Sequence, residues 1–288
     1  PAFLNAAECA TLAAMCARVP ASLGRMEVND SRWTVGEEAA LLERIEAAVG
    51  ELTAQANHDE ELPLLPLETR PSRVYGDGHG TTASPDDFAL AFPVGLHVDC
   101  NGGTARRFAS ALIYLTTPGA GGHTVFPLAR SPSLDVERCH ERGSSASAHP
   151  AASAVHALDD YDGALEAGKR LLEGGCYHTA QARRAHAAHA ATLLARAASD
   201  QGIKVEARAG NLMVFWTRDA KGAVCPFSWH GGAQVLPSHG SSGTRDTSCE
   251  PKLLLRKFKE VPTAVWDAGL GPTYVAERRE RFRRMFAR

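Results

Sequence analysis

The chain has 288 residues, enough for one large domain or two ordinary ones, and 44% of them are hydrophobic, which allows a sizeable core. A formal net charge of −2 gives no basis for a nucleic acid or an anionic membrane surface as partner, and no apolar run is long enough to span a membrane. Seven cysteines without CxxC spacing predict neither a disulfide framework nor a zinc ribbon.

Residues 1–70 are predicted to form helices that pack on the rest of the fold. Asn5 with Glu8 three positions later is typical of a helix cap in which each residue bonds the other's backbone. A second capping box is expected from Thr34 to Glu37. Apolar residues follow each start at helical spacing: Leu12, Met15, Cys16 and Val19, then Leu41, Ile45, Ala48, Val49 and Leu52.

From residue 71 the pattern changes to short apolar runs separated by Gly, Pro and Asp, which predicts strands of a sandwich or barrel. The expected strands are 73–75, 89–98, 108–116, 123–126, 203–207, 212–216, 232–236 and 252–258. Residues from about 129 to 202 interrupt this series and are predicted to be a largely helical insertion. A Gly-Pro turn at 271–272 leads into a basic helix within 261–288.

A candidate metal site begins with His97-Val98-Asp99. Side chains at i and i+2 of a strand point to the same face, so the imidazole and the carboxylate are expected side by side. His230, at the edge of a later apolar strand, completes a set of two histidines and one carboxylate. Such a set leaves open positions on an octahedral iron(II), although zinc accepts the same ligands.

Motifs along most of the chain resemble the prolyl 4-hydroxylases, members of the 2-oxoglutarate and iron(II)-dependent dioxygenases. The matching pieces stand in the family's order: Phe3-Leu4-Asn5, Glu8-Cys9, Asn29-Asp30-Ser31-Arg32, Arg73-Val74-Tyr75, His97-x-Asp99, Leu112-Ile113-Tyr114-Leu115, Gly121-Gly122-His123-Thr124-Val125-Phe126-Pro127, Gly210-Asn211-Leu212-Met213-Val214-Phe215-Trp216, His230-Gly231-Gly232, and Lys252 with Lys257-Phe258. The Gly-Gly-x-Thr-Val-Phe-Pro run and the ordered ligands are the most specific of these signals.

The resemblance implies an α+β protein with one catalytic domain. Its core would be a double-stranded β-helix, or jelly roll, over 71–260, with the insertion at about 129–202, the supporting helices in 1–70 and the basic helix in 261–288. Iron(II) would be bound by the two histidines and the aspartate. Lys252 would bind the distal carboxylate of 2-oxoglutarate, with the Thr124 hydroxyl beside it.

Three departures from the family pattern affect these assignments. Val94 stands where the family commonly has a tyrosine that bonds 2-oxoglutarate, and Tyr114 is the expected replacement. The spacing from His230 to Lys252 is longer than usual, so Arg256, on the same face of that strand, is a second candidate for the cation. The insertion is the largest departure and is expected to reshape the substrate entrance.

The expected reaction is the hydroxylation of an unactivated C–H group with 2-oxoglutarate and O₂, giving succinate and CO₂, with ascorbate as reductant. The resemblance favours peptidyl proline, giving 4-hydroxyproline. Because Asp99 is present, hydroxylation is favoured over the halogenation of related enzymes that replace this carboxylate. The alternatives are an oxygenase acting on a free amino acid or small metabolite, and a catalytically silent binding module.

The family's usual home is the secretory pathway, and the cytoplasm is the alternative compartment. Neither the compartment nor the oligomeric state follows from the sequence.

Overall fold

The computed structural model describes most of the predicted elements but not all. The described residues are 2–19, 36–69, 96–100, 105–129, 161–173, 187–198, 202–236 and 251–286. Several predicted features lie outside them: the second capping box from Thr34, the pieces at 29–32 and 73–75, Val94, and most of the strand expected at 89–98.

Two N-terminal helices confirm the predicted ones. Helix α1 (Ala6–Arg18) begins at Asn5, whose side chain accepts a hydrogen bond from the backbone N–H of Glu8 at 3.0 Å. The Glu8 carboxylate in turn accepts from the N–H of Asn5 at 2.8 Å, so the predicted capping box is present. Helix α2 (Gly36–Leu52) buries one apolar face that includes Leu42, Ile45 and Val49.

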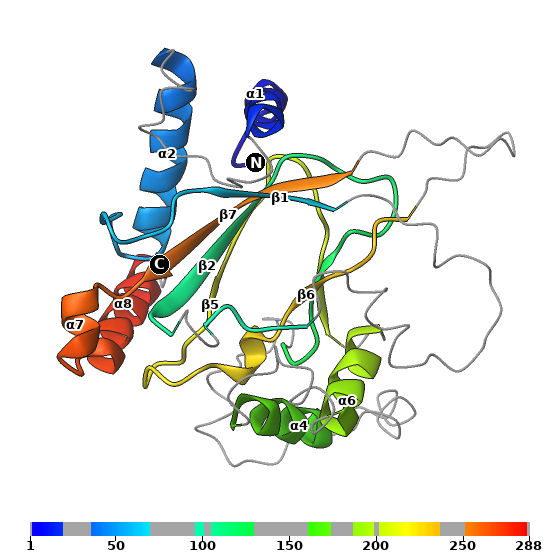
Figure 1. Cartoon of the computed structure of the whole chain (residues 1–288), viewed down its shortest axis with the longest axis vertical. Helices are drawn as coiled ribbons and strands as arrows, with labels where there is room; N and C mark the ends of the chain where they lie inside the picture. The colour runs from blue at the N-terminus through cyan, green and yellow to red at the C-terminus, as the bar shows by residue number, and fades with distance from the viewer. Residues whose placement is uncertain are drawn as a thin grey trace, which may run out of the picture.

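The centre of the molecule consists of two antiparallel sheets (Figure 1). The larger sheet has the order β1 (Leu65–Thr69), β7 (Lys252–Glu260), β2 (Arg107–Tyr114), β5 (Leu212–Trp216). The smaller sheet has the order β4 (Ile203–Val205), β3 (Thr124–Phe126), β6 (Gly231–Gly232). This mixture of helices and antiparallel sheet confirms the predicted α+β class.

The larger sheet is covered on one face and lines the candidate site with the other. Ile113 and Leu255 pack against the apolar faces of α1 and α2. Because side chains alternate along a strand, their neighbours Leu112, Tyr114 and Leu254 point to the opposite face. There the two sheets meet, since the ring of Phe126 lies 5.1 Å from that of Phe215 on β5.

Helices occupy the predicted insertion between β3 and β4. Helices α4 (Tyr161–Glu173) and α6 (Ala187–Ala198) pack on each other and lie together at the lower end of the molecule in Figure 1. Their apolar residues, including Leu171 and Leu193, join a core with Leu96 and Val98, the neighbours of His97. The insertion therefore supports the segment that carries the first two candidate metal ligands.

The C-terminal basic helix is also present. Helix α8 (Gly271–Phe286) begins at the predicted Gly-Pro pair, where proline fits the first turn of a helix. A short helix α7 (Thr263–Asp267) precedes it, and a 3₁₀ turn η4 (Pro226–Ser228) lies before β6. Within the described part of the chain, no helix is both long and apolar enough to cross a membrane.

Two strand predictions need correction. Strand β1 lies inside residues 1–70, where only helices were expected, and it forms one edge of the larger sheet. The strand expected at 232–236 is reduced to Gly231–Gly232, with one further bridge between Val235 and Gly121. The ladder stops because Gly121 and Gly122 turn out of the extended conformation, with φ of 71° and 70°.

Candidate metal centre

The structure brings His97, Asp99 and His230 together. Their candidate ligand atoms all lie within 4.8 Å of one another. The His97 Nε2 atom lies 3.3 Å from Asp99 Oδ1, and the His230 Nε2 atom lies 3.6 Å from Asp99 Oδ2. Within the described ranges, this is the group of His, Cys, Asp and Glu side chains arranged closely enough to hold a metal ion.

A reciprocal backbone pair holds the two histidines beside each other. The N–H of His97 donates to the carbonyl of His230 at 2.9 Å, and the N–H of His230 donates to the carbonyl of His97 at 2.9 Å. This pairing joins a segment before β2 to one before β6, far apart in the sequence. Asp99 lies close to both histidines because it is in a turn two residues after His97.

Neighbouring groups orient the metal-binding atoms. The Nδ1 atom of His230 lies 2.9 Å from the Ser228 carbonyl, which as an acceptor requires the proton on Nδ1 and leaves the Nε2 lone pair facing Asp99. The Ser110 hydroxyl donates to Asp99 Oδ2 at 2.6 Å. Ser110 was not predicted from the sequence, although it lies on the same face of its strand as Leu112 and Tyr114.

Aromatic packing fixes the ring of His230. It stacks on Phe126 with ring centroids 5.5 Å apart and meets the edge of Phe215 at 4.7 Å. The preceding residue, Trp229, is fully buried, and its indole N–H donates to the carbonyl of Gly168 on α4 at 3.2 Å. The insertion therefore also supports the segment that carries the third candidate ligand.

The protonation states suit a divalent cation. Burial lowers the pKa of His230 to about 4, so its imidazole is neutral at neutral pH. Burial alone would raise the pKa of Asp99, but His230, His97 and Ser110 together hold it below its ordinary value. A neutral imidazole and an ionised carboxylate are the forms that coordinate metal ions, so these residues fit such an ion.

A pocket beside the triad contains a second polar group. The ammonium of Lys252 donates to the Thr124 hydroxyl at 3.3 Å, and the Tyr114 hydroxyl lies 2.9 Å from the same oxygen. Lys252 is buried, and burial lowers its pKa to about 8. No carboxylate among the described residues lies within ion-pair distance of Lys252. Lys252, Thr124 and Tyr114, which were predicted to bind 2-oxoglutarate, are therefore neighbours, and they place one cation beside two hydroxyl groups.

The rest of the pocket wall is mostly apolar. Leu67, Leu112 and Leu254 are among the residues that line it. The reserve cation, Arg256, also lines it. The cavity that these residues enclose is small, about 40 Å³, and its positive charge and apolar walls suit the negatively charged end of a small molecule.

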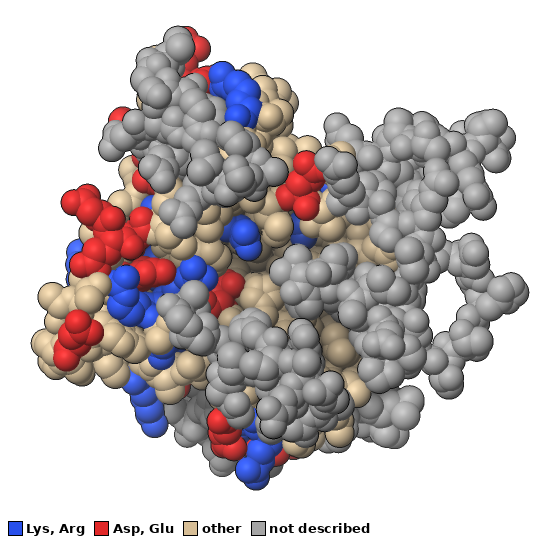
Figure 2. Space-filling view, in the orientation of Figure 1, with Lys and Arg blue, Asp and Glu red and all other residues tan. Residues whose placement is uncertain are grey.

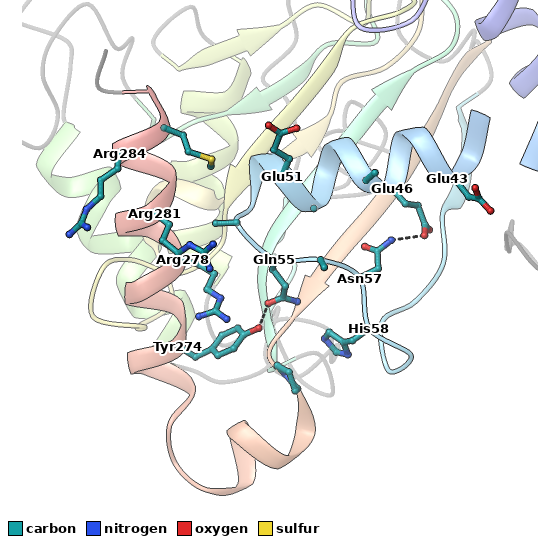
Figure 3. Close-up of a pocket in the computed structure, with 16 residues that line it drawn as sticks. Glu43, Glu46, Glu51, Gln55, Asn57, His58, Tyr274, Arg278, Arg281 and Arg284 are labelled. Carbon is teal, nitrogen blue, oxygen red and sulfur yellow. Dashed lines mark hydrogen bonds between the residues drawn. The ribbon is translucent and has the colours of Figure 1, made fainter. Parts of the chain in front are cut away.

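A larger groove of about 1170 Å³ lies elsewhere, between α2 and α8 (Figure 3). It has acidic residues of α2 on one side and arginines of α8 on the other. On the face in Figure 2, red and blue side chains adjoin at the left edge, where these two helices lie in Figure 1. Tyr274 and Gln55, at the junction of its walls, are hydrogen-bonded to each other at 2.5 Å. No lining residue is shared with the triad pocket, so this groove is separate from the candidate metal centre.

No known family model matches this chain, and a search of curated proteins finds no significant match either.

Proposed function

We propose that this protein is a 2-oxoglutarate and iron(II)-dependent oxygenase of the prolyl 4-hydroxylase type. One observation carries the proposal: two histidines and an aspartate converge beside a pocket that also contains a buried lysine hydrogen-bonded to a threonine. The first group suits a divalent metal, and the second suits the carboxylate of a small acid. Their combination in one pocket is what this reaction requires.

The finer fold belongs to the same proposal. A double-stranded β-helix consists of two facing antiparallel sheets with the metal between them. The contact of Phe126 with Phe215, and the bond from Ser110 on the larger sheet to Asp99, support this architecture. The insertion between β3 and β4 then projects from one end of the barrel.

Each side chain has a separate role in this proposal. His97, Asp99 and His230 would hold iron(II), which supplies O₂ activation and the oxidative decarboxylation of 2-oxoglutarate that hydroxylation needs. Lys252 binds the distal carboxylate, while Thr124 and Tyr114 orient that group through their hydroxyls. Leu112 and Leu254 exclude water from the reacting atoms.

Zinc is the alternative metal, because it accepts the same three ligands. The position of Lys252 favours iron. A zinc hydrolase needs an open position for water, whereas a buried lysine without a carboxylate partner among the described residues calls for an acidic cosubstrate.

Two substrate classes are compatible with this reaction. The resemblance favours peptidyl proline, converted to 4-hydroxyproline. A free amino acid or other small metabolite is the second class.

The experiment that tests the proposal measures succinate formed from 2-oxoglutarate with added iron(II) and ascorbate, in air and without oxygen. Proline-rich peptides and free amino acids serve as candidate substrates, with mass spectrometry detecting the gain of one oxygen atom. Oxygen-dependent succinate formation supports the proposal. No turnover in folded, iron-loaded protein would contradict it and favour the silent binding module.

Binding of 2-oxoglutarate is expected to weaken above pH 8. The pKa of Lys252 in the ligand-free protein is about 8, so its charged form is lost as the pH rises through that value. The apparent dissociation constant should then increase about tenfold for each further pH unit, since a neutral amine gives the carboxylate no ion pair. Calorimetry without oxygen, from neutral pH to two units above this pKa, measures the effect.

Two variants serve as controls. Lys252→Arg keeps a positive charge at all these pH values and should give a flat profile, with weaker binding overall because the guanidinium has another shape. Lys252→Ala should raise the 2-oxoglutarate requirement throughout. If Lys252→Ala bound 2-oxoglutarate as tightly as the wild-type protein, the residue that binds the distal carboxylate would be Arg256 instead.

A further inference from the structure

Arg256 places a second cation in the pocket of the metal centre. It lies on β7 four residues after Lys252, and strand alternation points both side chains to the same face. Its backbone pairs with Leu112 on β2 and Leu65 on β1, in the middle of the larger sheet. Arg256 lines the pocket together with His97, Asp99 and His230.

Within the described part of the chain, the Arg256 side chain is partly buried, and its guanidinium lies 5.9 Å from the centroid of the Phe258 ring. Its Nε atom is buried and has no hydrogen-bond partner there. No ion pair to a described carboxylate is formed either, although the charge of Asp99 acts on it from a greater distance. A buried Nε–H group without an acceptor is costly, and the guanidinium faces the pocket, so an acceptor from a ligand in the pocket is expected in the complete site.

The charges of the pocket indicate what that acceptor is. At neutral pH, Lys252 and Arg256 each contribute one positive charge, and Asp99 contributes one negative charge. A divalent metal ion would raise the resulting net charge from one to three. The 2-oxoglutarate dianion would return it to one, so a single positive charge is left without a counterion.

The two cations are not equivalent. Lys252 has the Thr124 hydroxyl within hydrogen-bond distance and the Tyr114 hydroxyl next to it, which gives one carboxylate several donors. Arg256 has a planar set of N–H donors that binds a second carboxylate in two places. Lys252 is therefore expected to bind the distal carboxylate of 2-oxoglutarate, which leaves Arg256 available to bind the primary substrate.

We infer that Arg256 binds a free carboxylate of the primary substrate, which makes that substrate a small carboxylic acid such as a free amino acid. This inference rests on the proposed function and deepens it. An internal proline of a polypeptide has no carboxylate of its own, whereas free proline does. Of the two substrate classes, the small molecule is therefore favoured.

The experiment compares free amino acids with their carboxamides, one at a time, on the wild-type protein. Binding is measured by calorimetry without oxygen, in the presence of iron(II) and 2-oxoglutarate, and turnover is measured as succinate in air. At least one amino acid is expected to bind about tenfold or more tightly than its amide, the range for a charge-assisted hydrogen bond. Equal binding of acid and amide, or binding of neither, would overturn the inference.

Variants of Arg256 assign the effect to this side chain. Arg256→Met should raise the KM for that amino acid by about tenfold or more and abolish the preference over the amide, while the half-saturating concentration of the cosubstrate stays within about twofold. Arg256→Lys should restore part of the preference. Arg281→Met, which changes an exposed arginine on α8, is the matched control and should behave as wild type.

Two further outcomes are informative. If Arg256→Met instead raised the half-saturating concentration of the cosubstrate, Arg256 would belong to 2-oxoglutarate and the inference would fail. If wild-type protein formed no succinate, the proposed function would fail. The same calorimetry without iron or 2-oxoglutarate would then still decide whether Arg256 selects carboxylates over amides.

Discussion

Replacing Asp99 by alanine is expected to abolish both metal binding and 2-oxoglutarate turnover. Asp99 lies between the two histidines and is the only anion among the three ligands, so its loss removes the charge that attracts a divalent cation. Substitutions that merely support a metal ligand cost about 10- to 100-fold in affinity or activity, and loss of a ligand should exceed that range. The measurements are iron bound per chain and succinate formed, with circular dichroism reporting the fold.

Two comparisons make this result specific. His97→Ala and His230→Ala should give the same outcome, because each removes one ligand. Ser110→Ala, which removes only the hydrogen bond to Asp99, should retain the metal at reduced affinity. Full turnover in Asp99→Ala would place the active site elsewhere in the chain.

Much of the candidate site could be predicted from the sequence because it depends on local rules and ordered motifs. The His97-x-Asp99 pair could be recognised as two candidate ligands two residues apart, although Asp99 lies in a turn after the bridge at His97 and not in the expected strand. His230 could be added because its segment resembles the family's third ligand. The close approach of His230 to His97 and Asp99 was not predictable, because it depends on the backbone bridge between His97 and His230.

Features created by tertiary contacts were missed. Strand β1 reads Leu-Pro-Leu-Glu-Thr, and the proline weakens any strand prediction. It is compatible with a strand here because β1 is at the edge of its sheet. Ser110 was missed for another reason: a serine within an apolar strand has no recognisable partner until the fold brings Asp99 to it.

A buried ion cluster on the outer face of β7 was missed for the same reason. The ammonium of Lys259, which is fully buried, lies 2.6 Å from a carboxylate oxygen of Glu61 and 2.8 Å from the side-chain oxygen of Asn57. Lys257 lies 3.9 Å from the same Glu61 oxygen. In the sequence, alternating lysines near the end of a strand predict a solvated face, but the loop after α2 covers them here.

Glu61→Ala is expected to be among the most destabilising single substitutions in the described part of the chain. It removes the buried anion opposite Lys259, and breaking one side of a buried ion pair costs about 3 to 5 kcal/mol because the remaining charge has no counterion. The other Glu61 oxygen accepts from the Gln55 side chain at 2.6 Å and from the Glu260 N–H at 3.2 Å, so these groups lose their acceptor too. Urea unfolding measures the loss, with Glu43→Ala, an exposed glutamate on α2, as the control expected to change nothing.

A double variant separates the two ways in which this cluster can contribute. Glu61→Leu combined with Lys259→Met replaces both charges by apolar groups, so neither is left buried alone. If the free energy of unfolding returns towards the wild-type value, the loss in Glu61→Ala arises from the uncompensated ammonium rather than from the pair itself. If the double variant is as unstable as Glu61→Ala, the hydrogen bonds of Glu61 to Gln55 and Glu260 are what hold the loop after α2 against β7. If Glu61→Ala alone is as stable as Glu43→Ala, the cluster has no stabilising role. None of these variants changes a residue that lines the metal pocket, so succinate formation by the folded fraction should stay at the wild-type level in each.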